Sequence, residues 1–475
     1  MSFWRGLTIL AMAGGLTAGI ASCGSEKKLV CGSDTTEQNG TCVATVYSNG
    51  WDNALTQELG VSLLKSYSGS SDGPDAWNTT TNPLVFISTM GPGYGGKLGG
   101  SLTWPGVVVI DANTYTVVAS RSYDMTAEGW TSVFEPHGLA VSMDGKWIYL
   151  PSGDGNDNGR LLIINARTLK LDKVIKTRGR PHHGKCFTNS VGKELVVFYG
   201  WAQPPFVMDP ADNNRVVGGV SYNESGIEGY LYFVTPDGKE MWGSGRWRQG
   251  SVASGVDGGT ALIEGQLFFS VDTTTWKLKN YMNFPGETTP IWIEFSPDNK
   301  YAFVSGGHSS SVLRYTRALT PAQNKAAPAI TPVGVVGPYG LRLNWTGTKI
   351  FAVGKQEGAG NLGIDLGIVD TSQIGDAGYV GERIVTNCLR GDHGSLHPTS
   401  SKDEFWISCN SSFEVVVIDM TNKVVKQRIA VPDAGSTHSG AFVQYDGAWV
   451  GRVLSDQNGL HGTALAEQLS KWTLP

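Results

Sequence analysis

The chain has 475 residues, of which 63 are glycine and 15 are tryptophan, and only 17% are charged. The formal net charge is −5, from 37 Lys and Arg against 42 Asp and Glu, so we expect no nucleic acid partner, because phosphate binding requires a basic surface. The hydrophobic content of 40% excludes a disordered chain. Many glycines and few charges are typical of short strands and tight turns, not of helical bundles or coiled coils.

The first 22 residues have the features of an export signal. Arg5 is the only charge before a weakly apolar stretch, residues 6–21, and small residues lead to Cys23. This segment resembles the lipobox of bacterial lipoproteins, which implies cleavage before Cys23, acylation of Cys23 and a lipid anchor in the membrane. The residue after Cys23 is Gly24 and not Asp. In that family this favours an outer membrane lipoprotein facing the periplasm or the cell surface. The alternative is an ordinary signal peptide with an incidental cysteine.

Residues 23–80 are rich in Ser, Thr, Asp and Asn, and we expect a lipidated cysteine, a small disulfide knob and a tether, with one helix over residues 53–66. An exported protein can form disulfides. Cys31 and Cys42 flank a short polar loop, whose closure contributes about 3 kcal/mol in the chain-entropy model. Cys388 and Cys409 are predicted to pair as neighbours in one sheet, which leaves Cys186 unpaired.

Residues 81–475 carry a repeat. A polar turn followed by an alternating β-rich run occurs in six segments: 142–150, 188–198, 296–304, 344–353, 400–408 and 444–453. The turn positions are 145, 192, 299, 347, 403 and 447. They are 44 to 56 residues apart except for one gap of 107, in which residues 263–271 supply the missing repeat. A period near 50 with strand–turn–strand content predicts an all-β fold, a β-propeller with seven blades, eight being the alternative.

Two irregularities are expected in this ring. Residues 83–120 have no inner strand of their own, so residues 438–453 are predicted to supply it and to close the ring. Residues 201–250 are predicted to be a long insertion in the third blade. The outer strands of residues 106–120, 160–174 and 413–427 share an apolar strand ending in Ile-Asp or Ile-Asn, a short turn and a second strand. This pattern resembles the YVTN family of β-propeller repeats, which implies the fold and leaves the function open.

The histidines occupy corresponding positions of the repeat. Four of them enter the start of an inner strand and form the predicted core of a metal site: His137, His183, His393 and His438. Two more are the next candidate ligands: His182 and His308. We expect all eight histidines, including His397 and His461, on one face of the ring. Imidazole is a ligand for copper, zinc, iron and nickel, and ligands one blade apart converge at the axis. The alternative is a set of hydrogen-bonded imidazoles that caps the axis without a metal.

Other polar groups lie near these histidines. Glu135 and Asp392 flank two of them and are candidates to orient the imidazoles or to act as general acid or base; a solvated loop is the alternative. Arg180 and Arg342 are near blade starts and are candidates to bind an anionic substrate; packing or a carboxylate partner is the alternative. Cys186 could add a soft thiolate ligand, but strand alternation favours burial as a small apolar side chain.

The axial histidines also resemble those of two propeller enzymes. One is the copper-cluster domain of nitrous oxide reductase, and the other is the zinc site of the peptidyl-hydroxyglycine lyase propeller. The likeness covers the position in the blade and not a continuous sequence. Nitrous oxide reductase also needs a C-terminal cupredoxin domain, for which no residues remain before Pro475, and Tyr339 stands where its sixth blade would offer a ligand. We therefore do not expect that enzyme.

These observations predict a membrane-anchored, metal-dependent oxidoreductase. Copper is the favoured cofactor, with zinc or iron as alternatives, and the expected partners are a small-molecule substrate and a periplasmic electron-transfer protein. The rival interpretation is a non-catalytic surface lipoprotein that binds a protein or glycan through the propeller face. A third is a haem-binding propeller similar to the cytochrome d1 domain; the sequence has no CxxCH motif, which argues against c-type haem.

Overall fold

The computed structural model describes residues 35–38, 41–44, 51–78, 82–90, 104–128, 136–152, 159–201, 203–222, 227–247, 267–283, 290–306, 309–317, 329–355, 365–431, 436–446 and 449–474. The chain forms two compact units, residues 1–49 and residues 50–475. In the first, β1 (Thr35–Gln38) and β2 (Thr41–Ala44) pair antiparallel. The export signal, Cys23 and Cys31 lie outside the described residues, so the lipid anchor and the Cys31–Cys42 disulfide stay predictions.

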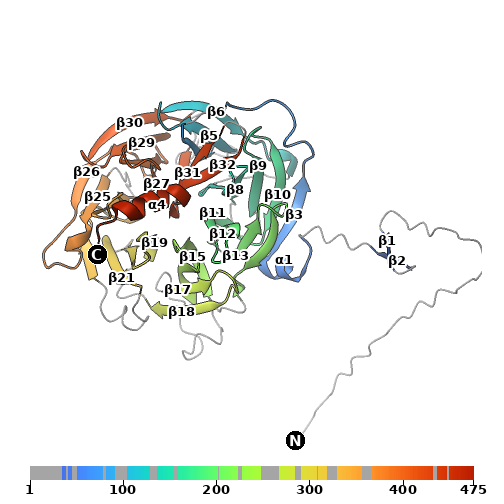
Figure 1. Cartoon of the computed structure of the whole chain (residues 1–475), viewed down its shortest axis with the longest axis horizontal. Coiled ribbons are helices and arrows are strands. Elements are labelled where there is room, and N and C mark those ends of the chain that lie inside the picture. The colour runs from blue at the N-terminus through green and yellow to red at the C-terminus, as the bar shows by residue number, and fades with distance from the viewer. Residues whose placement is uncertain are drawn as a thin grey trace, which may run out of the picture. The chain divides into compact units, whose positions relative to one another are not determined.

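The second unit is a ring of seven antiparallel sheets, each named here by its innermost strand (Figure 1). The β7 blade contains β7 (Ala140–Val141), β8 (Trp147–Ser152), β9 (Arg160–Asn165), β10 (Leu171–Thr177) and, outermost, β3 (Val61–Ser66). The β11 blade contains β11 (Arg180–Thr188), β12 (Glu194–Trp201), β13 (Gln203–Asp209) and β14 (Arg215–Gly219). The β15 blade contains β15 (Ile227–Val234), β16 (Glu240–Trp247), β17 (Leu267–Asp272) and β18 (Leu278–Asn283). The predicted seven-bladed, all-β propeller is confirmed.

The remaining blades follow the same order from the axis outward. The β19 blade contains β19 (Pro290–Phe295), β20 (Tyr301–Gly306), β21 (Ser311–Thr316) and β22 (Ala329–Pro332). The β23 blade contains β23 (Pro338–Leu343), β24 (Lys349–Gly354), β25 (Asp365–Asp370) and β26 (Glu382–Val385). The β27 blade contains β27 (Gly391–Leu396), β28 (Glu404–Cys409), β29 (Glu414–Asp419) and β30 (Val424–Ala430).

The seventh blade joins the two ends of the propeller sequence. Its inner strand is β31 (Ser436–Tyr445), which pairs antiparallel with β4 (Leu84–Met90), followed outward by β5 (Pro105–Asp111) and β6 (Thr116–Ser122). On the other side of β31 lie β32 (Gly451–Asp456) and β33 (Gly459–Leu460). Closure of the ring by a C-terminal strand is therefore confirmed.

The start of the second unit differs from the expected tether and long helix. The helix α1 (Ala54–Leu59) begins at the Asn53 cap, whose side chain accepts the backbone N–H of Thr56, and it ends at Gly60, which has φ +67°. The helix is therefore shorter than expected. The chain continues directly after Gly60 as β3, which pairs with β10. Residues 51–78 therefore belong to the unit that bears the blades, although we assigned them to the tether.

The repeated turns explain both the success and the error of the repeat analysis. The turns after the inner strands have a left-handed residue at predicted positions such as Gly145, Gly192 and Asn299. Gly238, in the turn between β15 and β16, is a further member that we missed. Residues 201–250 are therefore no insertion: the described part of this range contains the outer strands of one blade and the inner strands of the next. Residues 263–271 were predicted to supply the missing repeat; their described part, from Leu267 on, belongs to the third strand β17 of its blade.

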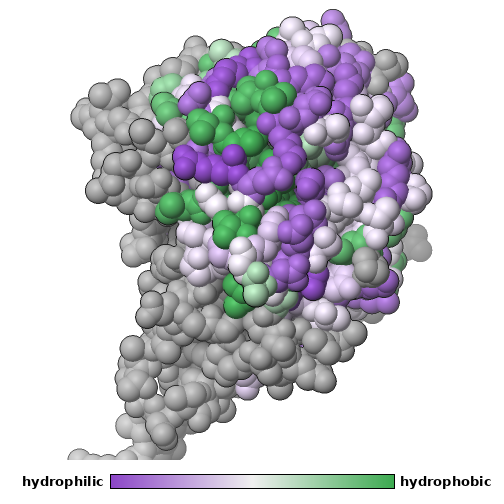
Figure 2. Space-filling view, turned by 90° about the vertical axis from the view of Figure 1, so that its left-hand side faces the viewer, coloured by the Kyte–Doolittle hydropathy of each residue, from purple (hydrophilic) through white to green (hydrophobic). Residues whose placement is uncertain are grey.

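The core lies between adjacent blades. Strands in the middle of a blade are covered on both faces, so that β4, β5 and β28 are buried along their whole length, whereas outermost strands such as β6 and β30 are largely exposed. The side of the ring in Figure 2 is accordingly a mixture of hydrophilic residues with small hydrophobic groups between them. No helix in the described part of the chain is long and apolar enough to span a membrane.

The C-terminal strap, defined here as residues 451–474, covers one end of the ring axis. It comprises β32, β33 and the helix α4 (Gly462–Lys471), which lies across the centre of the ring in Figure 1. Asn458 bonds to both backbone groups of Val234 in the β15 blade, at 2.8 and 3.1 Å, and the Thr473 N–H donates to the Thr346 carbonyl in the β23 blade. The strap is thus fixed to separate blades across the axis.

Candidate metal centre

Histidines from four blades meet at the ring axis, where the inner strands begin. His137 precedes β7, His182 and His183 lie in β11, His393 lies in β27 and His438 lies in β31. All five of these histidines are buried, with at most 5% of each residue exposed. The structure thus brings together all of the predicted histidine ligands that it describes. His308 and Glu135 lie outside the described residues, so their roles stay predictions.

His137 is at the middle of this cluster. Its ring stacks on His182 with centroids 3.8 Å apart, and its centroid lies 4.3 Å from that of His438. The rings of His183 and His393 are each 5.0 Å from it. Histidines that are up to 301 positions apart in the sequence therefore pack as one group, because corresponding strands of different blades converge at the axis.

Bulges at the start of the inner strands explain why adjacent side chains can face the same way. The pairing register shifts between Pro181 and His183 in β11, and between Gly391 and Gly394 in β27. β31 shifts at the corresponding place. A bulge sets two residues opposite one and re-aims their side chains. Neighbours that would otherwise alternate, such as His182 with His183, therefore both join the cluster.

Close packing at the axis also requires a small residue. A Cβ atom on Gly138 would lie 2.7 Å from the His183 Cα and 2.8 Å from its Nδ1, distances that real Cβ atoms do not show. The glycine after His137 therefore allows the β7 and β11 blades to approach closely enough for their imidazoles to touch.

Asp392 is the charge centre of the cluster and is fully buried. Its Oδ2 lies 2.9 Å from His438 Nδ1, 3.3 Å from His137 Nε2 and 3.5 Å from His393 Nδ1. Its Oδ1 lies 3.0 Å from the Lys355 ammonium, which is itself buried. Burial alone would raise the pKa of Asp392, but His393, Lys355 and the bond from His438 hold this pKa well below its usual range. The carboxylate is therefore ionised.

Four of the clustered imidazoles, those of His137, His182, His183 and His393, are neutral because they are buried. Burial, followed by the charges of neighbouring groups, lowers the pKa of His137, His182 and His183 well below the ordinary value. Burial lowers the pKa of His393 to about 3, although Asp392 opposes the shift. A neutral imidazole has a nitrogen lone pair, which is the form that binds metals.

Several ring nitrogens of the cluster make no hydrogen bond to any described residue. Both nitrogens of His137 and of His393 are in this state, as is Nε2 of His183. Burying such groups without a hydrogen bond costs about 1–3 kcal/mol each, so native proteins seldom do it without compensation. The hydrogen-bonded capping role that we considered as the alternative does not account for these nitrogens.

The cluster supplies two overlapping sets of ligands. His137, Asp392, His393 and His438 offer ligand atoms that all lie within 4.8 Å of one another, and so do His137, His182 and His183. Imidazole with one carboxylate is a donor set that suits copper, zinc, iron or nickel. The residues present therefore fit a transition metal ion.

Three residues that complete this site escaped the sequence analysis. Lys355 follows the second strand of the β23 blade, at the place where His308 follows that of the β19 blade, and this shared position was a usable signal. Gln457 comes from the strap, and its Oε1 lies 3.2 Å from His183 Nδ1. Trp292 in β19 packs with its ring 5.1 Å from that of His393. Nothing in the sequence marks these last two residues.

The structure corrects the expectation that all histidines share one face. His461 lies in the strap at the opposite end of the axis, as the residue before α4, where its Nε2 is 2.8 Å from Asp456 Oδ1. His397 comes directly after β27 ends, is buried, and accepts the N–H of Thr399. Neither is among the clustered histidines, because His397 follows the inner strand β27 and His461 belongs to the strap.

The two candidate arginines differ. Arg180 opens β11 beside His182 and is partly buried, so its substrate role stays a prediction. Arg342 is buried, pairs with Glu294 at 2.6 Å, and donates to the carbonyls of Gly394 and Asp456. It has the carboxylate partner that we considered as the alternative and holds the inner strands to the strap, and its substrate role stays a prediction.

Of the cysteines, Cys388 and Cys409 form the predicted disulfide, with Cα atoms 5.2 Å apart. Disulfides persist in oxidising compartments, which agrees with an extracytoplasmic protein. Cys186 is a free, buried thiol, as alternation predicted.

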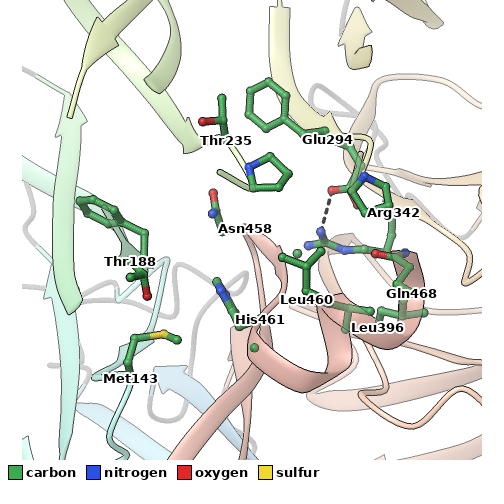
Figure 3. A pocket seen from close by; sticks show the side chains of 17 residues that line it. Met143, Thr188, Thr235, Glu294, Arg342, Leu396, Asn458, Leu460, His461 and Gln468 are labelled. Atoms are coloured by element: carbon green, nitrogen blue, oxygen red, sulfur yellow. Dashed lines mark hydrogen bonds and ion pairs between the residues drawn. The ribbon is translucent and has the colours of Figure 1, made fainter. Parts of the chain in front are cut away.

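A cavity of about 140 Å³ lies at the strap end of the axis (Figure 3). Ends of inner strands line it together with the strap, including Thr188, Glu294, Arg342, Asn458, His461 and Gln468. Burial raises the pKa of Glu294 despite the Arg342 charge beside it.

Comparison with solved structures supports the fold. A protein of Lactobacillus plantarum matches with a TM-score of 0.51 and 14% identity, over 76% of this chain and 99% of its own. A candidate 6-phosphogluconolactonase of Bacteroides fragilis matches with a TM-score of 0.52 and 14% identity, over 77% of this chain and 99% of its own. The periplasmic gluconolactonase of Pseudomonas aeruginosa matches with a TM-score of 0.50 and 15% identity, over 75% of this chain and 99% of its own.

Comparison of sequences gives no further relatives: no family model and no curated protein matches the chain. At 14 to 15% identity the structural matches establish a fold and no chemistry. The chain is a seven-bladed β-propeller similar to these structures, with a buried histidine and aspartate cluster that fits a metal ion.

Proposed function

We propose that this protein is an exported copper-dependent oxidoreductase whose metal is held by the histidines at the ring axis. One observation carries the proposal. His137 and His393 are buried, their four ring nitrogens make no hydrogen bond to described residues, and both belong to one ligand set with Asp392 and His438. A bound metal ion would satisfy nitrogens for which the described part of the chain supplies no hydrogen bond.

Charge favours copper over divalent ions that do not change oxidation state. Burial keeps the imidazoles of His137 and His393 neutral, and the Asp392 carboxylate is already balanced by Lys355 at 3.0 Å. Every charge on the metal is therefore added to a buried, neutral site, where uncompensated charge is costly. Copper in its reduced form adds one positive charge instead of two, and oxidised copper leads the affinity order for nitrogen and oxygen ligands.

The chain's own residues would orient the ligands and exclude water. Asp392 accepts from His438 Nδ1 and Gln457 from His183 Nδ1, so that each imidazole presents its other nitrogen to the metal. The rings of Trp292 and Tyr339, both 5.1 Å from that of His393, cover the cluster with apolar surface. Copper would supply one-electron chemistry toward a small molecule.

We further propose that the protein acts outside the cytoplasm as a lipoprotein anchored through Cys23. The Cys388–Cys409 disulfide supports export, and the segment before Cys23 supports the anchor. A periplasmic electron-transfer protein is the partner that one-electron chemistry would require.

Metal content tests the proposal. The protein would be exported to the periplasm of an expression host, purified without a histidine tag and analysed by elemental mass spectrometry before and after incubation with copper. We expect near-stoichiometric copper in the wild type and its loss in His393→Ala and His183→Ala. His397→Ala is the matched control, because it removes a buried imidazole of the β27 blade that lies outside the cluster.

Circular dichroism would show that each variant is folded. If the folded wild type takes up no copper, zinc or iron, or if His397→Ala loses as much copper as His393→Ala, the proposal is wrong. Copper that binds but shows no reversible change of its electron paramagnetic resonance signal on reduction would overturn the oxidoreductase part alone.

A further inference from the structure

A second group of metal-ligating side chains lies between the β11 blade and the strap. We propose that Cys186, Asp456 and His461 form a zinc site that is separate from the histidine cluster. The ligand atoms of these three residues lie within 4.8 Å of one another, and no residue of the group is more than 8% exposed.

The geometry brings the three side chains together from three elements. Cys186 is in β11, Asp456 is the last residue of β32, and His461 stands directly before α4. The Asp456 carboxylate is the centre: its Oδ2 lies 3.3 Å from Cys186 Sγ and its Oδ1 lies 2.8 Å from His461 Nε2. The His461 side chain makes no capping hydrogen bond to α4, so its ring is turned to the aspartate.

The backbone fixes the carboxylate in this place. The N–H of Asn458 donates to Asp456 Oδ1 at 2.7 Å, and the Asp456 carbonyl accepts from the Arg342 guanidinium at 3.1 Å. Asn458 is in turn bonded to Val234. A rigid frame of this kind keeps the ligands in position without the ion, which lowers the cost of binding.

The donor set matches zinc in type and in charge. Zinc takes thiolate, imidazole and carboxylate ligands, and three of them with one further position make a four-coordinate site. On binding, the Cys186 thiol gives its proton to solvent and the thiolate coordinates the ion. The two charges of the ion are then balanced by this thiolate and by the Asp456 carboxylate. Among the described residues, the histidine cluster has no free negative charge to balance a divalent ion, because Lys355 already pairs with Asp392. We therefore expect zinc at the Cys186 site and copper at the histidine cluster.

The cavity in Figure 3 provides access and the fourth ligand. His461 lines this cavity together with Asn458 and Gln468, so an ion next to the imidazole is reached from it. A water molecule in the cavity would complete the coordination. Because its ligands come from β11 and from the strap, the ion would join the end of the chain to the β11 blade.

Cobalt substitution tests the site, because cobalt bound to a thiolate gives a near-ultraviolet sulfur-to-metal charge-transfer band that imidazole and carboxylate ligands do not give. The exported protein would be stripped of metal by a chelator and titrated with Co²⁺. We expect one such band in the wild type and in His393→Ala, and its loss in Cys186→Ser. We expect Zn²⁺ to abolish the band by displacing Co²⁺.

His461→Gln provides a variant that keeps the thiol. We expect it to weaken Co²⁺ binding at this site at least about tenfold, the size of effect that loss of a metal-supporting contact has elsewhere. The His393→Ala control separates the two sites, since failure of the copper proposal leaves this band unchanged. Absence of the band in folded wild type at saturating Co²⁺, or its persistence in folded Cys186→Ser, would overturn the zinc site.

Discussion

Gln457 Oε1 lies 3.2 Å from Nδ1 of His183, although 274 positions separate the two residues in the sequence. The contact joins the strap to the histidine cluster. It also fixes the His183 tautomer, because an amide oxygen can only accept, so Nδ1 carries the proton and Nε2 has the lone pair.

Replacing Gln457 should therefore weaken metal binding without removing a ligand. In Gln457→Leu, His183 is free to exchange its tautomers and to rotate, and we expect copper affinity to fall by about 10- to 100-fold. Competition with a chromophoric chelator would measure it. Gln457→Glu retains the acceptor and should stay within a few-fold of the wild type. Equal affinity in Gln457→Leu and wild type would show that this contact does not position the ligand.

Asp392→Asn should destabilise the apoprotein strongly. The substitution removes a buried carboxylate 3.0 Å from the buried Lys355 ammonium, and loss of one partner of such a pair costs about 3–5 kcal/mol. The free energy of unfolding in urea would measure the loss. Lys355→Met in the Asp392→Asn background removes the remaining charge and should recover most of it. A double variant no more stable than Asp392→Asn would contradict this account.

Stability should fall as the pH decreases through the range set by the buried histidines. Burial lowers the pKa of His397 to about 4, whereas the unfolded value is about 6.5. Between these values the unfolded chain binds a proton that the folded protein does not, so stability is complete above the higher value and is lost as the pH falls to the lower one. For His397 the loss is about 3 kcal/mol.

His397→Gln, which keeps an acceptor for the Thr399 N–H, should accordingly move the acid-unfolding midpoint to lower pH. Tryptophan fluorescence followed from pH 8 to about pH 3 would show it, the lower limit being set by the His393 pKa of about 3. The control is an exposed substitution, Val191→Thr, which changes no titrating group. An unchanged midpoint in His397→Gln would mean that His397 is already protonated in the folded protein.

The Cys388–Cys409 disulfide should stabilise the β27 blade. The two residues are 21 positions apart, and closing a loop of this length contributes about 3 kcal/mol in the chain-entropy model. Cys388→Ala with Cys409→Ala should lower the free energy of unfolding by about this amount, measured in urea. Dithiothreitol should destabilise the wild type equally and leave the double variant unchanged. A reductant effect on the double variant would place the sensitivity elsewhere in the chain.

The fold was predictable because it repeats. Each inner hairpin needs a tight turn with a left-handed residue, and positions such as Gly145 and Asn299 mark these turns in the sequence. Residues 201–250 were wrongly predicted to be an insertion because the turn at Gly238, between β15 and β16, was not recognised. The repeat of this blade was instead assigned to β17, which is the third strand of the sheet. A blade is misplaced when the turn residue that marks its inner hairpin is not recognised in the sequence.

The histidine cluster was predictable for a related reason, since equivalent positions of a closed ring converge. The residues that surround it were not. Lys355 comes from a second strand and Gln457 from the strap, and only the folded ring brings them to Asp392 and His183. His461 was predicted on the wrong face for the same reason: it lies in the strap, which does not follow the blade repeat.

Closure of the ring by β31 also sets the order in which the site comes into being. The inner strand of the seventh blade is made from residues 436–445, although its partners β4–β6 are made from residues 84–122. During synthesis and export, the N-terminal strands therefore wait for a partner through most of the chain's emergence, with the edge of β4 exposed. His438 arrives with that last strand, so a chain shortened before it lacks both a closed ring and one of the candidate ligands, and under the proposed function metal binding would require that the chain be made through β31.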